Sequence, residues 1–160
     1  MDNLNTMVEK LLNEIDEDFH SIEKYNKKQV EVLEKQEKKI KETATTLLPI
    51  MRKIKSNMYF FTAKENNLIA RTRRGPILKF DNIEDLLYVF SVDSEMPMIV
   101  DLNNEDNAKY ISYDKLLREV EFTQIMENLL SVLTFTDSIK KQYQNTINQF
   151  ETELNKYENL

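Results

Sequence analysis

The sequence predicts an α+β protein, mostly α-helical, in which two long helices flank a small β-rich head that contains one short helix. Apolar residues recur at heptad spacing over both ends of the chain, which is typical of helices that pack through a narrow stripe. The chain has one glycine and three prolines, the residues that interrupt helices. Between the two ends, short apolar runs alternate with turn residues, as they do in strands. The predicted units are an N-terminal coiled-coil helix (1–56), the head (57–112) and a C-terminal coiled-coil helix (113–160).

The N-terminal helix is predicted over residues 3–48. Its heptad stripe contains Leu12, Ile15, Phe19, Ile22, Leu33, Ile40 and Leu47. Acid-to-lysine pairs four residues apart, such as Glu31 and Lys35, support a helix with a solvated outer face. Pro49 is expected to kink or end the helix near Leu48. The middle of the stripe is polar, which indicates either a looser section or a device that fixes the register of the coil; its residues are Asn26, Gln29, Gln36 and Thr43.

The head is predicted to form strands at residues 58–63, 68–74, 77–80 and 96–102, with a further short strand at 108–112. Residues 64–67 and 103–107 are expected to be loops, and Gly75 with Pro76 a turn. Asp81 and Glu84 have the spacing of a capping box, which predicts a helix over about 82–91. The expected core of the head is Tyr59, Phe61, Leu68, Ile77, Leu78, Phe80, Leu86, Leu87, Phe90, Ile99 and Val100.

The C-terminal helix is predicted to begin at a cap formed by Ser112 or Asp114, with a kink or break in residues 134–138. Its stripe contains Leu129, Leu133, Tyr143, Ile147, Phe150 and Leu154, and continues through Met126, Thr136, Lys140 and Tyr157. Two helices of similar length predict an antiparallel hairpin within one chain or a coiled coil between chains, and a homodimer is the expected assembly. The spacing does not decide between the two arrangements.

Residue types that carry most catalytic chemistry are scarce. The chain has no cysteine and one histidine, His20, which lies in the first helix, so the usual zinc sites cannot form within one chain. A single glycine excludes the glycine-rich phosphate loops. The acidic residues of the head, among them Asp81, Asp85 and Asp101, are interpreted as solvated. The sequence therefore predicts a non-enzymatic protein with no metal site and no cofactor.

The net charge of the chain is −6, which argues against nonspecific DNA binding because such binding requires a positive surface. No apolar run approaches the roughly 20 residues that span a bilayer, and residues 1–10 lack the order of a signal peptide. A cytoplasmic location is expected, in the host cell if the chain is phage-encoded.

The candidate partner-binding residues are Arg71, Arg73, Arg74 and Lys79. On a strand, Arg71 and Arg73 point to one face, and two guanidinium groups on one face can grip carboxylates or phosphates. The cluster could instead protect an edge strand or pair with acids of the head. An acidic protein partner is the preferred interpretation, and a nucleic-acid-binding adaptor that uses residues 71–74 is the alternative.

Equal helices on either side of a β-rich insert resemble the outline of prefoldin subunits, which would imply a chaperone or assembly subunit. The small size, the acidity and a composition typical of AT-rich genomes resemble the small accessory proteins of phages, including inhibitors of host defence nucleases. The expected function is protein–protein interaction: a coiled-coil stalk presents the head to a protein partner, as a phage-type inhibitor or regulator of a host protein would.

Overall fold

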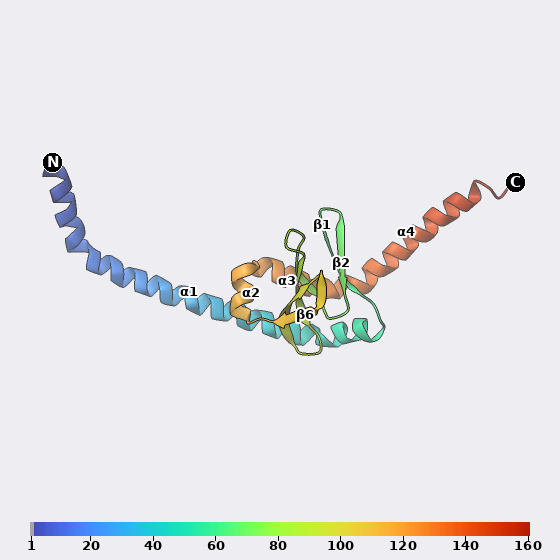
Figure 1. Ribbon diagram of the computed structural model, residues 1–160, viewed down its shortest axis with the longest axis horizontal. Coiled ribbons are helices and arrows are strands. Elements are labelled where there is room, and N and C mark those ends of the chain that lie inside the picture. The colour runs from blue at the N-terminus through green and yellow to red at the C-terminus, as the bar shows by residue number, and fades with distance from the viewer. Residues whose placement is uncertain (1) are drawn as a thin grey trace. The chain divides into compact units, whose positions relative to one another are not determined.

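The computed structural model describes residues 2–160, with side chains from residue 3 onward, and its elements are shown in Figure 1. A long first helix, α1, spans Asp2–Ser56. Six strands follow: β1 Phe61–Glu65, β2 Leu68–Thr72, β3 Ile77–Asp81, β4 Leu86–Ser91, β5 Met96–Asp101 and β6 Asn104–Tyr110. The chain then forms α2 Tyr113–Glu119, α3 Phe122–Leu130, a 3-10 turn η1 Ser131–Thr134 and α4 Phe135–Asn155. The α+β class is confirmed.

The chain divides into two compact units, residues 1–39 and 40–160. In the first unit, which is helical, none of residues 3–39 is buried. Phe19 and Ile22 of the heptad stripe are each 56% exposed, and Leu12 is 61% exposed. Ile15 and Leu33 are half-buried. Such a helix carries an apolar stripe that its own unit does not cover.

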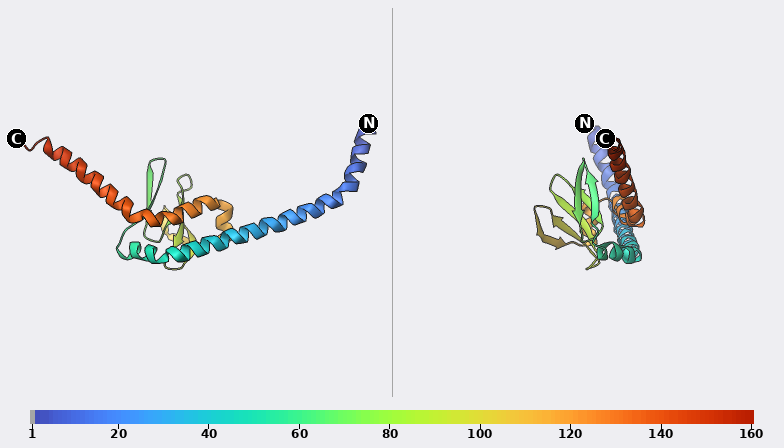
Figure 2. Two further views of the ribbon diagram at one scale, coloured as in Figure 1. Left: turned by 180° about the vertical axis from the view of Figure 1, so that it is seen from behind. Right: turned by 90° about the vertical axis from the view of Figure 1, so that its right-hand side faces the viewer.

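The second unit is built on a four-stranded antiparallel sheet of order β3-β4-β5-β6, with β1 and β2 as a separate hairpin. One face of the sheet packs against α3 and residues 40–54 of α1, and Figure 2 shows the strands to one side of these helices. The other face packs against the β1–β2 hairpin, whose Ala63 and Ala70 belong to one apolar cluster with Leu87 and Val100. The sheet is therefore the middle of three layers, and both of its faces are apolar.

Strand β4 replaces the helix that the sequence predicted over residues 82–91. The Asp81 side chain accepts hydrogen bonds from the backbone N–H groups of Ile83 (3.1 Å) and Glu84 (3.1 Å). The Glu84 bond, more than the others, holds the pKa of the Asp81 carboxyl below its ordinary value. The same bonds that would cap a helix here close the β3–β4 turn, since Asx turns and caps share their chemistry. The helix prediction was wrong because β4 is buried on both faces.

Of the two alternatives predicted for Pro49, an end of the helix near Leu48 was wrong, because Pro49 lies inside α1, which continues to Ser56. Leu48 and Met51, on either side of the proline, are buried in the core of the second unit. This packing offsets the hydrogen bond that the proline cannot make. Three residues of the predicted heptad stripes are likewise buried in the chain's own core. They are Ile40, Leu47 and Leu129.

The long C-terminal helix is not confirmed, since residues 113–160 form α2, α3, η1 and α4. Ser112 caps α2 as predicted, accepting a hydrogen bond from the Lys115 N–H at 3.1 Å. The expected loop at 103–107 is instead the exposed first part of β6, and of the expected core only Tyr59 and Leu68 are exposed. With α1 at 55 residues and α4 at 21, the equal arms on which the resemblance to prefoldin subunits rested are absent.

Gly75 is required by a close approach of two backbones and not by a turn. The Val92 N–H donates to the Arg74 carbonyl (2.9 Å) and the Phe90 N–H donates to the Pro76 carbonyl (3.0 Å). Gly75 thus lies directly against β4, and a Cβ at this position would be 1.7 Å from the Phe90 carbonyl oxygen. Only glycine fits there, whatever its φ angle.

A Tyr–Glu–Lys contact joins the sheet to α2. The Tyr88 hydroxyl donates to the Glu119 carboxylate at 2.7 Å, and Lys79 Nζ donates to the Glu119 carbonyl at 3.3 Å. Lys79 Nζ also lies 5.7 Å from the centre of the Tyr88 ring. Burial, followed by the bond to Glu119, raises the pKa of Tyr88 to about 12.

We predict that Gly75→Ala destabilises the protein by about 3 kcal/mol, because the added methyl group overlaps the Phe90 carbonyl and forces two strands apart. Urea denaturation followed by circular dichroism measures this change. Ile83→Ala, in an exposed turn (87% exposed), should change stability by less than about 0.5 kcal/mol. Equal losses in the two variants would contradict the close-approach argument.

We predict that Tyr88 makes stability fall in alkali. Its pKa is higher in the folded state, so its contribution is complete below pH 10 and is lost as pH rises from 10 to about 12. The loss should approach about 2–3 kcal/mol by linkage. Tyr88→Phe should lack this component and cost about 1 kcal/mol at neutral pH. Urea denaturation of both proteins at pH 7, 9 and 11 tests this, and identical pH profiles would contradict it.

Candidate functional site: an arginine–phenylalanine cluster

The β1–β2 hairpin brings Arg71 and Arg73 together on Phe60. Asn66 and Asn67, both at positive φ (48° and 65°), form the two-residue turn that sets the register. In that register Phe61 pairs with Thr72 and Thr62 pairs with Arg71. Phe60 therefore extends the hairpin opposite Arg73.

Both guanidinium groups lie over the phenyl ring. The Cζ atom is 4.6 Å from the ring centre for Arg73 and 5.6 Å for Arg71, within the range of cation–π attraction. This geometry agrees with the prediction that alternate strand residues share a face. Apart from this contact with Phe60, neither guanidinium group forms a hydrogen bond or an ion pair with residues 3–160.

No carboxylate of residues 3–160 forms an ion pair with Arg71 or Arg73 within 4.0 Å. Two other arginines are paired: Arg52 with Glu95 (3.4 Å) and Arg118 with Asp114 (2.9 Å). Pairing of the cluster with the head's own acids, one of the alternatives from the sequence, is therefore not what the structure shows.

Arg74 is the third arginine of the cluster, and two hydrogen bonds hold it in place. Its guanidinium donates to the Glu105 carbonyl at 3.0 Å, and its backbone N–H donates to the Thr72 hydroxyl at 3.2 Å. The cluster borders a hollow of about 540 Å³ between the hairpin and the sheet. The hollow is lined by Phe60, Arg71, Thr72, Arg73, Arg74, Leu87, Val100 and Glu105. With three guanidinium groups and one carboxylate at its border, it is locally positive on an acidic protein.

The chemistry available here is recognition of anions. Two stacked guanidinium groups with free edges can each bind a carboxylate or a phosphate through two N–H groups. Stacking on Phe60 restricts the side chains before any ligand arrives, which lowers the entropy lost on binding. Leu87 and Val100, which also border the hollow, are core residues with almost no exposed surface.

The other predicted binding residues lie elsewhere. Lys79 belongs to the contact with Tyr88 and Glu119 and does not line the hollow at the arginines. Of the predicted stripes, the exposed residues are Leu12, Phe19, Ile22, Leu133, Tyr143, Ile147, Phe150 and Leu154. Sequence reasoning missed Phe60, since its role depends on the register of the hairpin. The pair of asparagines in the turn was the signal that could have given that register.

No protein-family model, no curated protein and no solved structure matches this chain. Among residues 2–160, no group of three or more His, Asp or Glu side chains is arranged to hold a metal ion. No helix in that range has the length and apolarity to cross a membrane. The site must therefore be interpreted from its own geometry.

We predict that Arg71→Ala with Arg73→Ala lowers stability by less than about 1 kcal/mol, because only exposed cation–π contacts are lost. Thermal and urea denaturation measure this. Loss of the same two side chains should not cause aggregation, since the backbone pairing of Thr62 with residue 71 and of Ala63 with Ala70 is kept. Unfolding or aggregation of the double variant would show that the arginines serve the fold.

Proposed function

We propose that this chain is a non-enzymatic protein–protein interaction protein whose head binds an acidic surface of a protein partner. The observation that carries the proposal is the pair Arg71 and Arg73, stacked on Phe60 and unpaired with carboxylates of residues 3–160. Pre-arranged arginines beside an aromatic ring are frequent anchors of protein interfaces. A partner that supplies two carboxylates would complete the site.

The proposal includes self-association through the heptad stripes. Phe19 and Ile22 of α1 and Ile147 and Phe150 of α4 are at least half exposed, and a coiled coil between two copies would bury such residues. A homodimer would present two heads, and two linked sites bind a repeated partner more tightly than one. The proposed location is the cytoplasm, or that of the host cell for a phage-encoded chain.

The narrower form of the proposal is a phage-type inhibitor or regulator of a host defence protein. Its support is the small size and the charge of −6, which together suit a protein that occupies a surface made for an acidic ligand. The arginine cluster would then supply a local attachment to acidic residues near that surface. Inhibition of a purified host nuclease, lost on Arg71→Ala with Arg73→Ala, would be its direct sign.

A nucleic-acid-binding adaptor is the second candidate, since the same guanidinium edges fit phosphates. The net charge of −6 opposes the approach of a nucleic acid, which carries phosphate charges along its whole length, more strongly than that of a protein surface with a few carboxylates. Duplex DNA therefore serves as a competing ligand in the test.

The test is titration with a polyglutamate peptide of roughly ten residues, followed by fluorescence anisotropy at low salt. We predict that Arg71→Ala with Arg73→Ala weakens binding at least about tenfold, which corresponds to about 1.4 kcal/mol. Added salt should weaken binding further in the wild type than in the variant, because the variant has fewer charges to screen.

Arg52→Ala with Arg118→Ala is the matched control, since it removes the same number of charges from exposed arginines that are already paired with Glu95 and Asp114. It should bind the peptide as the wild type does. Equal weakening by this control would show that only total charge matters. Tighter binding of a DNA duplex than of the peptide, lost on Arg71→Ala with Arg73→Ala, would favour the adaptor instead.

A further inference from the structure

The stripe of α4 is an exposed apolar surface of the second unit. Tyr143, Ile147, Phe150 and Leu154 follow one another at steps of four and three residues, Tyr157 continues the spacing two residues past the end of the helix at Asn155, and each of the five is 50% to 65% exposed. No residue of α4 is buried. Isolated helices of this length are marginal in water, so a stripe of this kind calls for a covering surface.

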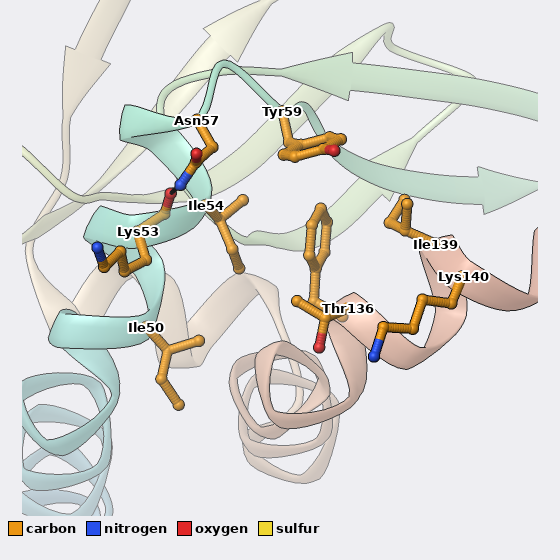
Figure 3. Close-up of a pocket in the computed structure, with 9 residues that line it drawn as sticks. Ile50, Lys53, Ile54, Asn57, Tyr59, Thr136, Ile139 and Lys140 are labelled. Carbon is orange, nitrogen blue, oxygen red and sulfur yellow. Dashed lines mark hydrogen bonds between the residues drawn. The ribbon is translucent and has the colours of Figure 1, made fainter. Parts of the chain in front are cut away.

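The stripe leads into an apolar hollow at the start of α4. The hollow has a volume of about 250 Å³ and lies between the last turns of α1 and the first turns of α4. Figure 3 shows Ile50 and Ile54 on one side and Thr136, Ile139 and Lys140 on the other. Thr136 and Lys140 are themselves positions of the stripe, so the hollow and the stripe form one continuous surface.

We propose that this surface binds a second copy of the chain, with the two α4 helices antiparallel. The proposal rests on the self-association named under the proposed function and specifies its element, orientation and register. The argument for the orientation comes from Lys140, the one charged residue in the stripe between Tyr143 and Thr136.

In a parallel pair each stripe residue faces its own equivalent, so Lys140 would face Lys140 of the second copy within an apolar seam. Like charges placed opposite one another in this way are destabilising. A parallel pair would also bring the acidic ends, with Glu151, Glu153 and Glu158, side by side. Charge therefore disfavours the parallel arrangement.

In an antiparallel pair the register follows from the spacing. Placing Ile147 against Phe150 of the second copy also places Tyr143 against Leu154, because both pairs are centred on the same point of the helix. It brings Lys140 level with Tyr157 of the second copy, which lies in the turn just after the end of α4. Lys140 then lies beside Glu153 and Glu158 of the second copy, which flank Leu154 and Tyr157 in the sequence.

The same register explains the hollow. Tyr157 of the second copy reaches Lys140, which borders the hollow opposite Ile50 and Ile54. An aromatic ring can enter a volume of about 250 Å³, and its hydroxyl can remain near the Lys140 ammonium group. Each end of the pair would then be closed by a tyrosine from the other copy.

The buried area sets the expected affinity. Five half-exposed side chains contribute roughly 100 Å² each, so two copies bury about 1,000 Å². That is the lower limit for a specific interface, and a dissociation constant in the micromolar range is expected.

We predict a specific pattern of disulfides in this chain, which has no native cysteine. Copies with Tyr143→Cys mixed with copies with Leu154→Cys should form a mixed disulfide under mild oxidation, because the two positions meet in the antiparallel register. Tyr143→Cys alone should not cross-link. Asn145→Cys mixed with Thr152→Cys, which has the same axial relation on the outer face, should give no cross-link.

A second measurement uses charge and needs no oxidation. Lys140→Glu should raise the dimer dissociation constant about fivefold in analytical ultracentrifugation, because it places a carboxylate beside Glu153 and Glu158 of the second copy. Adding Glu153→Lys should restore the affinity. In a parallel pair Lys140→Glu would only exchange one like-charge contact for another, so an unchanged constant would contradict the proposal.

The outcomes separate this inference from the proposed function. A dimer in which Tyr143→Cys alone cross-links overturns the antiparallel register and leaves self-association in place. A wild-type chain that stays monomeric at about 200 µM, twenty times a 10 µM constant, overturns both the register and the homodimer. Binding of polyglutamate concerns a different surface, the one formed by Arg71 and Arg73. The titration with the peptide tests that binding independently of the dimer.

Discussion

The burial of the last turns of α1 is the interaction on which the second unit depends. Met51 has no exposed surface, and Ile40, Ala44, Leu47 and Ile54 are nearly as buried. They pack against one face of the sheet together with Ile125 and Leu129 of α3. Each such side chain contributes roughly 1.5–3 kcal/mol when it leaves water. Without this helix the sheet and α3, which packs on β3, would expose the apolar side chains that α1 now covers.

The other face of the sheet carries the candidate site, and its position depends on β4. Leu87 and Val89 of β4 contact Ala70 of the hairpin, while the backbone of Phe90 holds the segment around Gly75. That segment is the direct continuation of the strand that bears Arg71 and Arg73. The most deeply buried strand, β4, thus holds the segment that follows the arginines. The position of the exposed arginine cluster therefore depends on this buried strand.

Sequence reasoning succeeded where one physical signal decided the structure. The Ser112 cap and the strands at residues 68–72, 77–81 and 96–101 follow from capping chemistry and from alternation of apolar residues.

Sequence reasoning failed where the same residues are compatible with two different structures. Asp81 and Glu84 have the spacing of a helix start, and the same Asp81 bonds close a turn. Pro49 lacks its hydrogen-bond donor in any helix, and only the packing of Leu48 and Met51, which is not local, keeps α1 continuous. The direction of Arg71 and Arg73 was predictable from strand periodicity, but Phe60 was not, because the contact needs the register between two strands.

The heptad pattern illustrates why periodicity alone does not assign a partner. Ile40 and Leu47 continue the spacing of Leu12 and Phe19, yet the first two are buried in the chain's own core and the last two are exposed. A period of seven says which side of a helix is apolar, and it says nothing about what covers that side. Charge adds the missing information in α4. In the antiparallel pair that we propose, Lys140 lies beside Glu153 near the end of α4 and Glu158 just beyond that end. The residue that most weakens the stripe as a uniform apolar seam is therefore the one on which the proposed orientation rests.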